Sequence, residues 1–172
     1  DDGSIDDSVK IFNNFPLNYH KELVVHNKNL GRNHARNSGI KKAQGLWCFF
    51  TNSNIELEKN ILKNYINFCT QSNAIGFVGP IFYTCDDKKF ENYLNKPWRG
   101  VLKLKSGDVV PPNLLLFSNF FVQRKIFERV GEFNKKFNGY GGSEFEMAAR
   151  ISKIYPNSFE YLSSCTATRS NH

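Results

Sequence analysis

The sequence predicts an α/β domain built around a mostly parallel sheet with helices packed against it. Three observations predict this class. Short apolar runs alternate with segments of helical periodicity, the 172 residues are enough to bury a sizeable core, and 40% of them are hydrophobic. We therefore interpret residues 1–172 as a single globular domain. No apolar run approaches the roughly 20 residues that a helix needs to span a bilayer.

The first half of the chain alternates between strand and helix. Residues 22–26 (ELVVH) are predicted as a short strand, and residues 31–45 show helical spacing, with Gly45 placed to end the helix. A second strand follows at residues 46–50. Residues 55–69 then place apolar side chains on one face of a second helix: Leu57, Ile61, Leu62, Tyr65, Ile66 and Cys69.

The second half is interrupted by a long polar segment. A strand at 74–83 contains Gly79 and Pro80, and residues 84–113 form a Gly- and Pro-containing stretch that we expect to be a surface loop. The pattern then resumes with a strand, a short helix, a longer helix and a last strand, at residues 114–124, 125–131, 143–155 and 159–164.

The charge of the chain favours an anionic partner. A formal charge of +7 and a pI near 9.2 suit nucleic acid, an anionic membrane surface or a nucleotide diphosphate. Lysines and arginines are scattered, and no RNA-binding or zinc-finger pattern is present, so we predict no nucleic-acid partner. A basic nucleic-acid-binding module remains a third hypothesis, which has the charge in its favour and no motif.

The cysteines and the first residues bear on location. The four cysteines are widely spaced without a C-x-x-C pair, which indicates a reducing, cytoplasmic compartment. The opening DDGSIDD is acidic, whereas a signal peptide would be basic and then apolar. The positive charge also leaves open a peripheral association with the inner face of a membrane.

Four segments follow one another in a recognisable order: DDGSIDDS (1–8), NLGRNHARNSGIKKAQGLWCFFTNSN (29–54), LFSNFFVQRKIFERVGEFNKKFNGYGG (116–142) and SEFEMAARI (143–151). Together they resemble the inverting family-2 glycosyltransferases of the GT-A fold, with a C-terminal half similar to the galactosyltransferase and chondroitin-polymerase type. The resemblance implies a GT-A-like sheet, a UDP-sugar donor and a saccharide acceptor. In this family a strand, a helix and a strand precede the D-D-G-S segment, so we expect the domain to be incomplete at its N-terminus.

The resemblance assigns three residues to the nucleotide. Asp1 and Asp2 stand at a predicted strand end, and the second aspartate of this motif contacts uracil in the family. Arg36 occupies the place of a basic residue that faces the nucleotide, and its planar fork of donors suits uracil oxygens or phosphate. The alternatives are that DDGS is an ordinary turn and that Arg36 is a solvated helix residue.

The family's metal-binding D-x-D motif corresponds to Asn52, Ser53 and Asn54. In the family its aspartates hold Mn²⁺ or Mg²⁺ against the donor diphosphate, and each asparagine keeps a carbonyl oxygen but removes a negative charge. Three interpretations stay open: weak metal binding with the diphosphate as main ligand, replacement of the metal by a lysine or arginine, or an inactive site. His172 stands where some relatives carry a metal-binding histidine.

The second half of the motif set supplies the catalytic candidates. Glu144 corresponds to the family's general base, which takes the proton from the acceptor hydroxyl. Tyr140, Gly141 and Gly142 resemble the turn that lines the donor sugar and acceptor, and Glu146 is a further candidate there. Glu146 also fits a capping box with Ser143 at the N-cap of the helix.

The loop at 84–113 supplies one more candidate. Trp98 and Arg99 are a candidate acceptor platform, with surface packing of the tryptophan as the alternative. The leading hypothesis is thus an inverting hexosyltransferase that moves a hexose or hexosamine from a UDP-sugar to a saccharide hydroxyl in glycan or polysaccharide synthesis. The alternative is a catalytically lapsed domain of this type that binds a nucleotide sugar or glycan.

Overall fold

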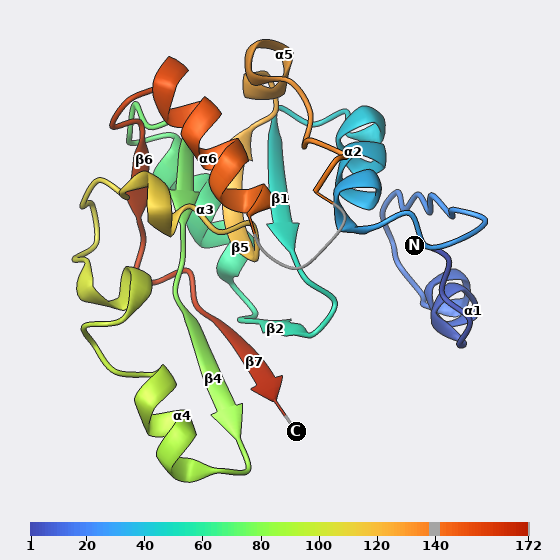
Figure 1. The fold of residues 1–172 in the computed structure, drawn as a ribbon, viewed down its shortest axis with the longest axis horizontal. Helices are drawn as coiled ribbons and strands as arrows, with labels where there is room; N and C mark the ends of the chain where they lie inside the picture. Colours follow the sequence, from blue (N-terminus) through green and yellow to red (C-terminus); the bar gives the residue numbers. More distant parts are fainter. Residues whose placement is uncertain (138–141, 172) are drawn as a thin grey trace.

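The computed structural model describes residues 1–137 and 142–171 (Figure 1). Within these residues a four-stranded sheet has the order β1–β5–β3–β6, with bounds Trp47–Thr51, Asn119–Gln123, Gly76–Val78 and Phe159–Tyr161. Strand β5 runs antiparallel to both β1 and β3, whereas β3 and β6 are parallel. This central sheet carries the core.

A smaller sheet extends from one end of the central sheet. Its order is β2–β7–β4, with bounds Ile55–Leu57, Ala167–Asn171 and Ile81–Cys85. Strands β2 and β7 are antiparallel, with Ile55 opposite Arg169, and β4 and β7 are parallel. Figure 1 shows this sheet below the central one, so that β2 lies directly beyond the end of β1.

Helices cover both faces of the central sheet. Because side chains alternate along a strand, Phe120 and Val122 of β5 face one core and Phe121 faces another. Helix α6 (Ser143–Ile154) packs on the first core through Met147, and α3 (Ile61–Cys69) packs on the second. The remaining helices are α1 (Ser8–Asn14), α2 (Arg32–Lys42), α4 (Lys88–Leu94), α5 (Ile126–Val130) and two 3₁₀ turns, Gly100–Lys103 and Pro112–Leu114.

The α/β class is confirmed, and the sheets are mixed rather than mostly parallel. The alternation of strands and helices does not encode strand direction, and β5 enters between β1 and β3 in the opposite sense after the 86–118 excursion. The predicted strand at 22–26 is wrong. Among the described residues its backbone pairs only with Asp1, through two hydrogen bonds, and this contact is too short to form a ladder.

Two further predictions are wrong because of how the strands pair in the fold. Residues 55–57 form β2 instead of the first turn of a helix, because they pair with β7. The predicted strand at 74–83 divides at Gly79 and Pro80 into β3 and β4, which belong to different sheets. On α3 the predicted apolar face is only partly buried, since Leu62 and Ile66 are exposed.

Two α-helices, one strand and the two 3₁₀ turns were not predicted at all. Helix α1 follows the acidic opening segment, α4 lies inside the expected surface loop, and β7 follows the last predicted strand. In the described part of the chain, none of the helices is both long and apolar enough to cross a membrane.

The two sheets are joined through the fully buried side chain of Asn119. Its Oδ1 accepts a hydrogen bond from the Tyr65 hydroxyl at 2.7 Å, and its Nδ2 donates to the carbonyls of Pro80 and Cys165 at 3.0 and 2.8 Å. These two carbonyls lie where the chain leaves β3 for β4 and β6 for β7. A methyl group on Gly79 would stand 2.0 Å from the Cys165 oxygen, so only glycine fits there.

We expect Asn119→Leu to lower the free energy of unfolding by about 3 kcal/mol, because it leaves the Cys165 carbonyl buried without its partner and the Tyr65 hydroxyl with only a long contact of 3.5 Å to the backbone carbonyl of residue 119. Chemical denaturation followed by tryptophan fluorescence measures this loss. Asn67→Leu, an exposed position on α3, is the matched control and should change stability by less than about 0.5 kcal/mol. Equal stabilities for the two variants would contradict a structural role for Asn119.

Candidate active site

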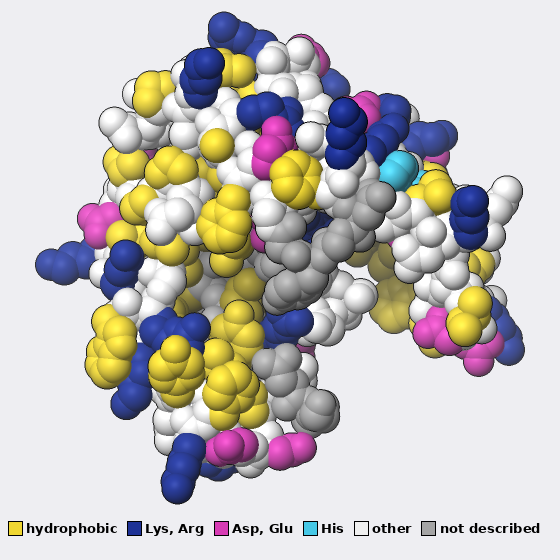
Figure 2. All heavy atoms as spheres, in the orientation of Figure 1, with side chains coloured by type: hydrophobic (Ala, Val, Ile, Leu, Met, Phe, Trp, Pro, Cys, Tyr) yellow, Lys and Arg dark blue, Asp and Glu magenta, His cyan; other side chains and the backbone are white. Residues whose placement is uncertain are grey.

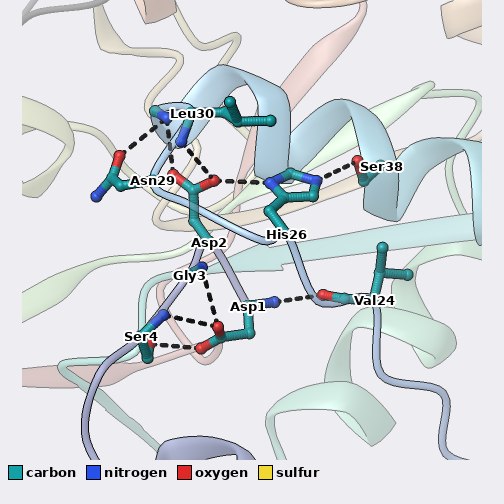
Figure 3. Close-up of polar contacts among 10 residues, drawn as sticks. Asp1, Asp2, Gly3, Ser4, Val24, His26, Asn29, Leu30 and Ser38 are labelled. Carbon is teal, nitrogen blue, oxygen red and sulfur yellow. Dashed lines mark hydrogen bonds and ion pairs between the residues drawn. The ribbon is translucent and has the colours of Figure 1, made fainter.

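The Asp2 carboxylate ties the first residues to the start of α2 (Figure 3). It accepts hydrogen bonds from the backbone nitrogens of Leu30 and Gly31 at 3.1 and 2.7 Å, and its Oδ1 lies 2.7 Å from Nδ1 of His26. The other ring nitrogen of His26 lies 2.9 Å from the Ser38 hydroxyl. This chain of contacts orients Asp2 against α2.

The surroundings of Asp2 favour its ionised form. Burial by itself would raise the pKa of Asp2, but the hydrogen bond from His26 and those from the Leu30 and Gly31 backbones lower it below the ordinary value. Asp2 is therefore a positioned anion at neutral pH.

Asp1 has a different, local role. Its carboxylate accepts from the backbone nitrogens of Gly3 and Ser4 at 3.0 and 2.9 Å and from the Ser4 hydroxyl, which closes a turn. Gly3 has φ +78°, and a Cβ there would lie 2.6 Å from the Lys28 carbonyl carbon. The turn interpretation of DDGS thus describes Asp1, whereas Asp2 reaches a distant segment.

Arg36 and Glu144 form an ion pair between α2 and the first turn of α6. Nη2 of Arg36 lies 2.6 Å from Oε1 of Glu144 and also donates to the Phe117 carbonyl at 3.3 Å. The guanidinium lies over the rings of Phe117 and Phe133. Its Nη1 is buried and has no hydrogen-bond partner among the described residues.

The two charged groups differ in environment. Burial lowers the pKa of Arg36, and the neighbouring Glu144 acts in the opposite direction. The side chain of Arg36 is 9% exposed and that of Glu144 is 17% exposed, so the carboxylate is the more accessible of the pair. The positive end of the α6 dipole also favours an anion at this position.

Two asparagines of α2 hold the helix that carries Arg36. The Asn37 amide makes a reciprocal pair of hydrogen bonds with the backbone of Phe133, both at 2.8 Å, and is 1% exposed. The Asn33 amide donates to the carbonyls of Asn134 and Phe137. These contacts dock α2 against residues 133–137 and fix where Arg36 enters the site.

The asparagines at the D-x-D position both have partners at the end of β1. Nδ2 of Asn52 donates to the Ser118 hydroxyl at 2.9 Å. With the Asn54 amide turned so that its oxygen faces Arg169 of β7, Nε and Nη2 of Arg169 both donate to Oδ1 at 3.1 Å. A fixed cation therefore lies next to Asn54.

These side chains do not fit a divalent cation. The Asn54 oxygen, which would be a ligand, already accepts two hydrogen bonds from a guanidinium, whose charge would repel a metal. Amides also lack the charge of the carboxylates that Mg²⁺ and Mn²⁺ prefer. In the described ranges no group of three or more His, Cys, Asp or Glu side chains is arranged to hold a metal ion.

The remaining candidates are placed as follows. Tyr140, Gly141 and His172 lie outside the described residues. The capping box is wrong: Gly142 is the N-cap, and no side chain caps the helix. Glu146 instead pairs with Arg150, with Oε1 2.6 Å from Nε. Because Arg150 also donates to backbone carbonyls next to α5, this pair braces α5 against α6.

Trp98 follows α4 and is one of three exposed aromatic residues there, with Phe90 and Tyr93 of the helix, which together are termed the aromatic group beside α4. Figure 2 shows hydrophobic side chains gathered with lysines and arginines over this part of the molecule. The Trp98 side chain is 67% exposed, and Lys96 lies over its ring. Next to this group is a largely apolar cavity lined by β4, the first 3₁₀ turn and residues 114–119, with Tyr83 and Arg99 among its polar residues.

Residues 116–119 connect these parts. Leu116 lines the cavity, the Phe117 carbonyl accepts from Arg36, the Ser118 hydroxyl accepts from Asn52, and the side chain of Asn119 joins the sheets. The structure thus brings Arg36 together with Glu144. Asn52 and Asn54 lie where the chain passes from β1 to β2, at the start of the smaller sheet.

The sequence-based prediction missed His26 and Arg169. His26 ends the apolar run ELVVH, and a polar residue at that place is a signal that could have been used. Arg169 lies in the segment ATRSN, which has no strand pattern, so no local signal placed it opposite Ile55.

The model of the family Glycosyl transferase family 2 matches residues 1–134 of the chain. None of the curated proteins matches it. Among solved structures, that of S. aureus TarS 1–349 in complex with UDP-GlcNAc is 14% identical to this chain, with a TM-score of 0.76. The match covers 99% of this chain and 48% of the TarS chain. The structure of TarS 1–349 with UDP is 16% identical, with a TM-score of 0.73 and coverages of 99% and 49%.

A third structure, of GalNAc-T7 with UDP, GalNAc and Mn²⁺, is 16% identical to this chain, with a TM-score of 0.62. The match covers 87% of this chain and 32% of the GalNAc-T7 chain. The chain thus spans about half the length of the TarS 1–349 structures. These likenesses confirm the predicted GT-A fold. Because the family model covers most of the sequence, from the D-D-G-S turn through β5 and α5, the chain belongs to glycosyltransferase family 2.

Proposed function

We propose that the protein is an inverting hexosyltransferase, which moves a hexose or hexosamine from a UDP-sugar to a saccharide hydroxyl. The observation that carries this proposal is the Arg36–Glu144 ion pair of 2.6 Å, which presents a partly exposed carboxylate at the start of α6. Solved structures of the same fold contain UDP-GlcNAc or UDP, which supports a UDP-sugar as donor.

The nucleotide is proposed to lie between Asp2 and Arg36. Asp2 is an anion held against α2 and can accept a hydrogen bond from the uracil ring, while Asp1 shapes the turn that places it. Arg36 is proposed to face the nucleotide from α2, because the planar fork of a guanidinium suits uracil or phosphate oxygens. Gly142 has φ +77° and stands at the N-cap of α6. With Tyr140 and Gly141 it is proposed to line the sugar.

In the proposed reaction the acceptor hydroxyl attacks the anomeric carbon from the face opposite the UDP. A carbon–oxygen bond to the acceptor forms as the bond to the diphosphate oxygen breaks, and the electron pair of that bond leaves with UDP. The hydroxyl proton passes to Glu144. Arg36 holds Oε1, so Oε2 is the oxygen left to take the proton.

The acceptor is proposed to rest on the aromatic group beside α4. Exposed aromatic rings stack on the apolar faces of sugars, and Trp98 offers the most exposed ring of this group. The adjoining cavity extends from there to Leu116, one residue from the carbonyl that contacts Arg36. A saccharide lying along this path would approach Glu144.

A second candidate function is a domain that binds a nucleotide sugar without turning it over. The amides at Asn52 and Asn54 favour it, because they remove two carboxylates from the family's metal motif. The two candidates differ in turnover and agree in nucleotide binding.

We expect the protein to bind UDP about 5- to 150-fold more tightly than ADP, because loss of one or two polar contacts to uracil costs about 1–3 kcal/mol. Isothermal titration of each nucleotide into the full-length protein measures the difference. Equal affinities would contradict a uracil site at Asp2.

We expect Glu144→Gln to reduce sugar transfer by about 10²- to 10⁴-fold and to leave UDP affinity unchanged. The glutamine keeps an oxygen for Arg36 but cannot take a proton. Release of UDP from a panel of UDP-sugars, with saccharide acceptors present, measures turnover.

Glu128→Gln, at a carboxylate on α5 that is 68% exposed, is the matched control and should retain full activity. If Glu144→Gln also keeps full activity, Glu144 is not the base. If the unmutated protein binds UDP but transfers no sugar in the whole panel, the second candidate function is favoured.

A further inference from the structure

Arg169 and Asn54 form a contact that the proposed function leaves unexplained. Arg169 lies on β7 opposite Ile55, the residue that follows Asn54, so strand pairing holds the guanidinium beside the D-x-D position. Within the described residues Arg169 forms no ion pair with an aspartate or glutamate. Its hydrogen-bond partner here is a neutral amide, so no acidic side chain of the described residues neutralises its positive charge.

The charge balance of this site differs from that of a metal-dependent one. Two carboxylates and a divalent cation sum to zero, whereas two amides and a guanidinium sum to one positive charge. Without a metal, this site therefore offers the diphosphate more net positive charge than the carboxylate motif offers with its metal bound. An aspartate at position 54 would cancel the charge of Arg169.

Among the described residues, the geometry also leaves donors of Arg169 without a protein partner and therefore available to a ligand. Nε and one hydrogen of Nη2 are directed to Asn54, so the second hydrogen of Nη2 and both hydrogens of Nη1 can bind other acceptors. A guanidinium presents its donors in a planar fork that matches two phosphate oxygens. Asn54 therefore orients Arg169 without using up its capacity to bind an anion.

We infer that Arg169, oriented by Asn54, binds the diphosphate of the nucleotide sugar and takes the place of the divalent metal, so that the donor binds without a metal ion. The inference rests on the proposed function, because it assumes that the diphosphate lies at the D-x-D position. Asn52 and Asn54 are then parts of an altered site, in which a cation of the chain stabilises the charge that develops on the leaving UDP.

The test compares UDP with uridine, which lacks the diphosphate, by isothermal titration into the full-length protein in EDTA and in Mn²⁺. We expect UDP to bind equally well in both buffers. Arg169→Gln should weaken UDP about tenfold or more, the loss of one charge-assisted phosphate contact, and leave uridine unchanged. Arg169→Lys should recover part of the affinity, which a merely structural arginine would not require.

Asn54→Asp provides an independent variant. If Arg169 binds the diphosphate, the new carboxylate pairs with Arg169 and the UDP affinity in EDTA should fall. If the site is instead a decayed metal site, the UDP affinity should be unchanged in EDTA and should rise in Mn²⁺. Arg129→Gln on α5 is the matched control and should bind UDP as the unmutated protein does, since Arg129 packs over Tyr155 away from this contact. Thermal melts report whether each variant is folded.

The outcomes separate the two proposals. UDP binding that requires Mn²⁺ and is unaffected by Arg169→Gln overturns the role of Arg169 and leaves the proposed function standing. Absence of UDP binding in both buffers overturns the proposed function itself. If Arg169→Gln does not fold, the response of Asn54→Asp in EDTA decides the question.

Discussion

The hydrogen bonds of the Asn119 side chain are the constraint on which the rest of the fold depends. The chain passes from the central sheet to the smaller sheet twice, at Pro80 and near Cys165, and both carbonyls are held by one buried amide. A buried amide with three partners is favourable only when all of them are in place, because each missing partner costs desolvation energy. The two crossings are therefore fixed together, and with them the positions of β4 and β7.

This junction also places the charged groups of the site. Asn119 begins β5, and the three residues before it contact the cavity, Arg36 and Asn52 in turn. On the other side, β7 begins two residues after Cys165 and carries Arg169 to Asn54. Residues far apart in the sequence meet here because each belongs to a segment that leaves the same junction. Substrate groups could thus be recognised by side chains that no single element supplies.

The sequence predicted the elements with strong local periodicity and missed those formed by pairing. Helices α2 and α6 and strand β1 were found because their apolar patterns are local signals, although the predicted end signals were wrong: α2 ends at Lys42 before Gly45, and Gly142 rather than Ser143 is the N-cap of α6. Strands β2 and β7 have weak patterns, and they exist because Ile55 and Arg169 face each other in the folded chain. The same distinction holds in the site: Glu144 and Arg36 were identified from motifs, but their ion pair and the docking of α2 through Asn37 follow only from the fold.

The asparagines at positions 52 and 54 illustrate how a motif can mislead when only its own residues are considered. In the sequence they remove two negative charges from a metal site, which suggests loss of function. In the fold a cation, Arg169, lies beside Asn54, and an aspartate at position 54 would neutralise it. An amide oxygen accepts hydrogen bonds from a guanidinium without cancelling its charge, whereas a carboxylate binds a metal ion. The asparagine at position 54 is therefore compatible with Arg169. The electrostatic requirement of a departing diphosphate is a nearby positive charge, and in the proposed site the guanidinium of Arg169 supplies that charge in place of a bound ion.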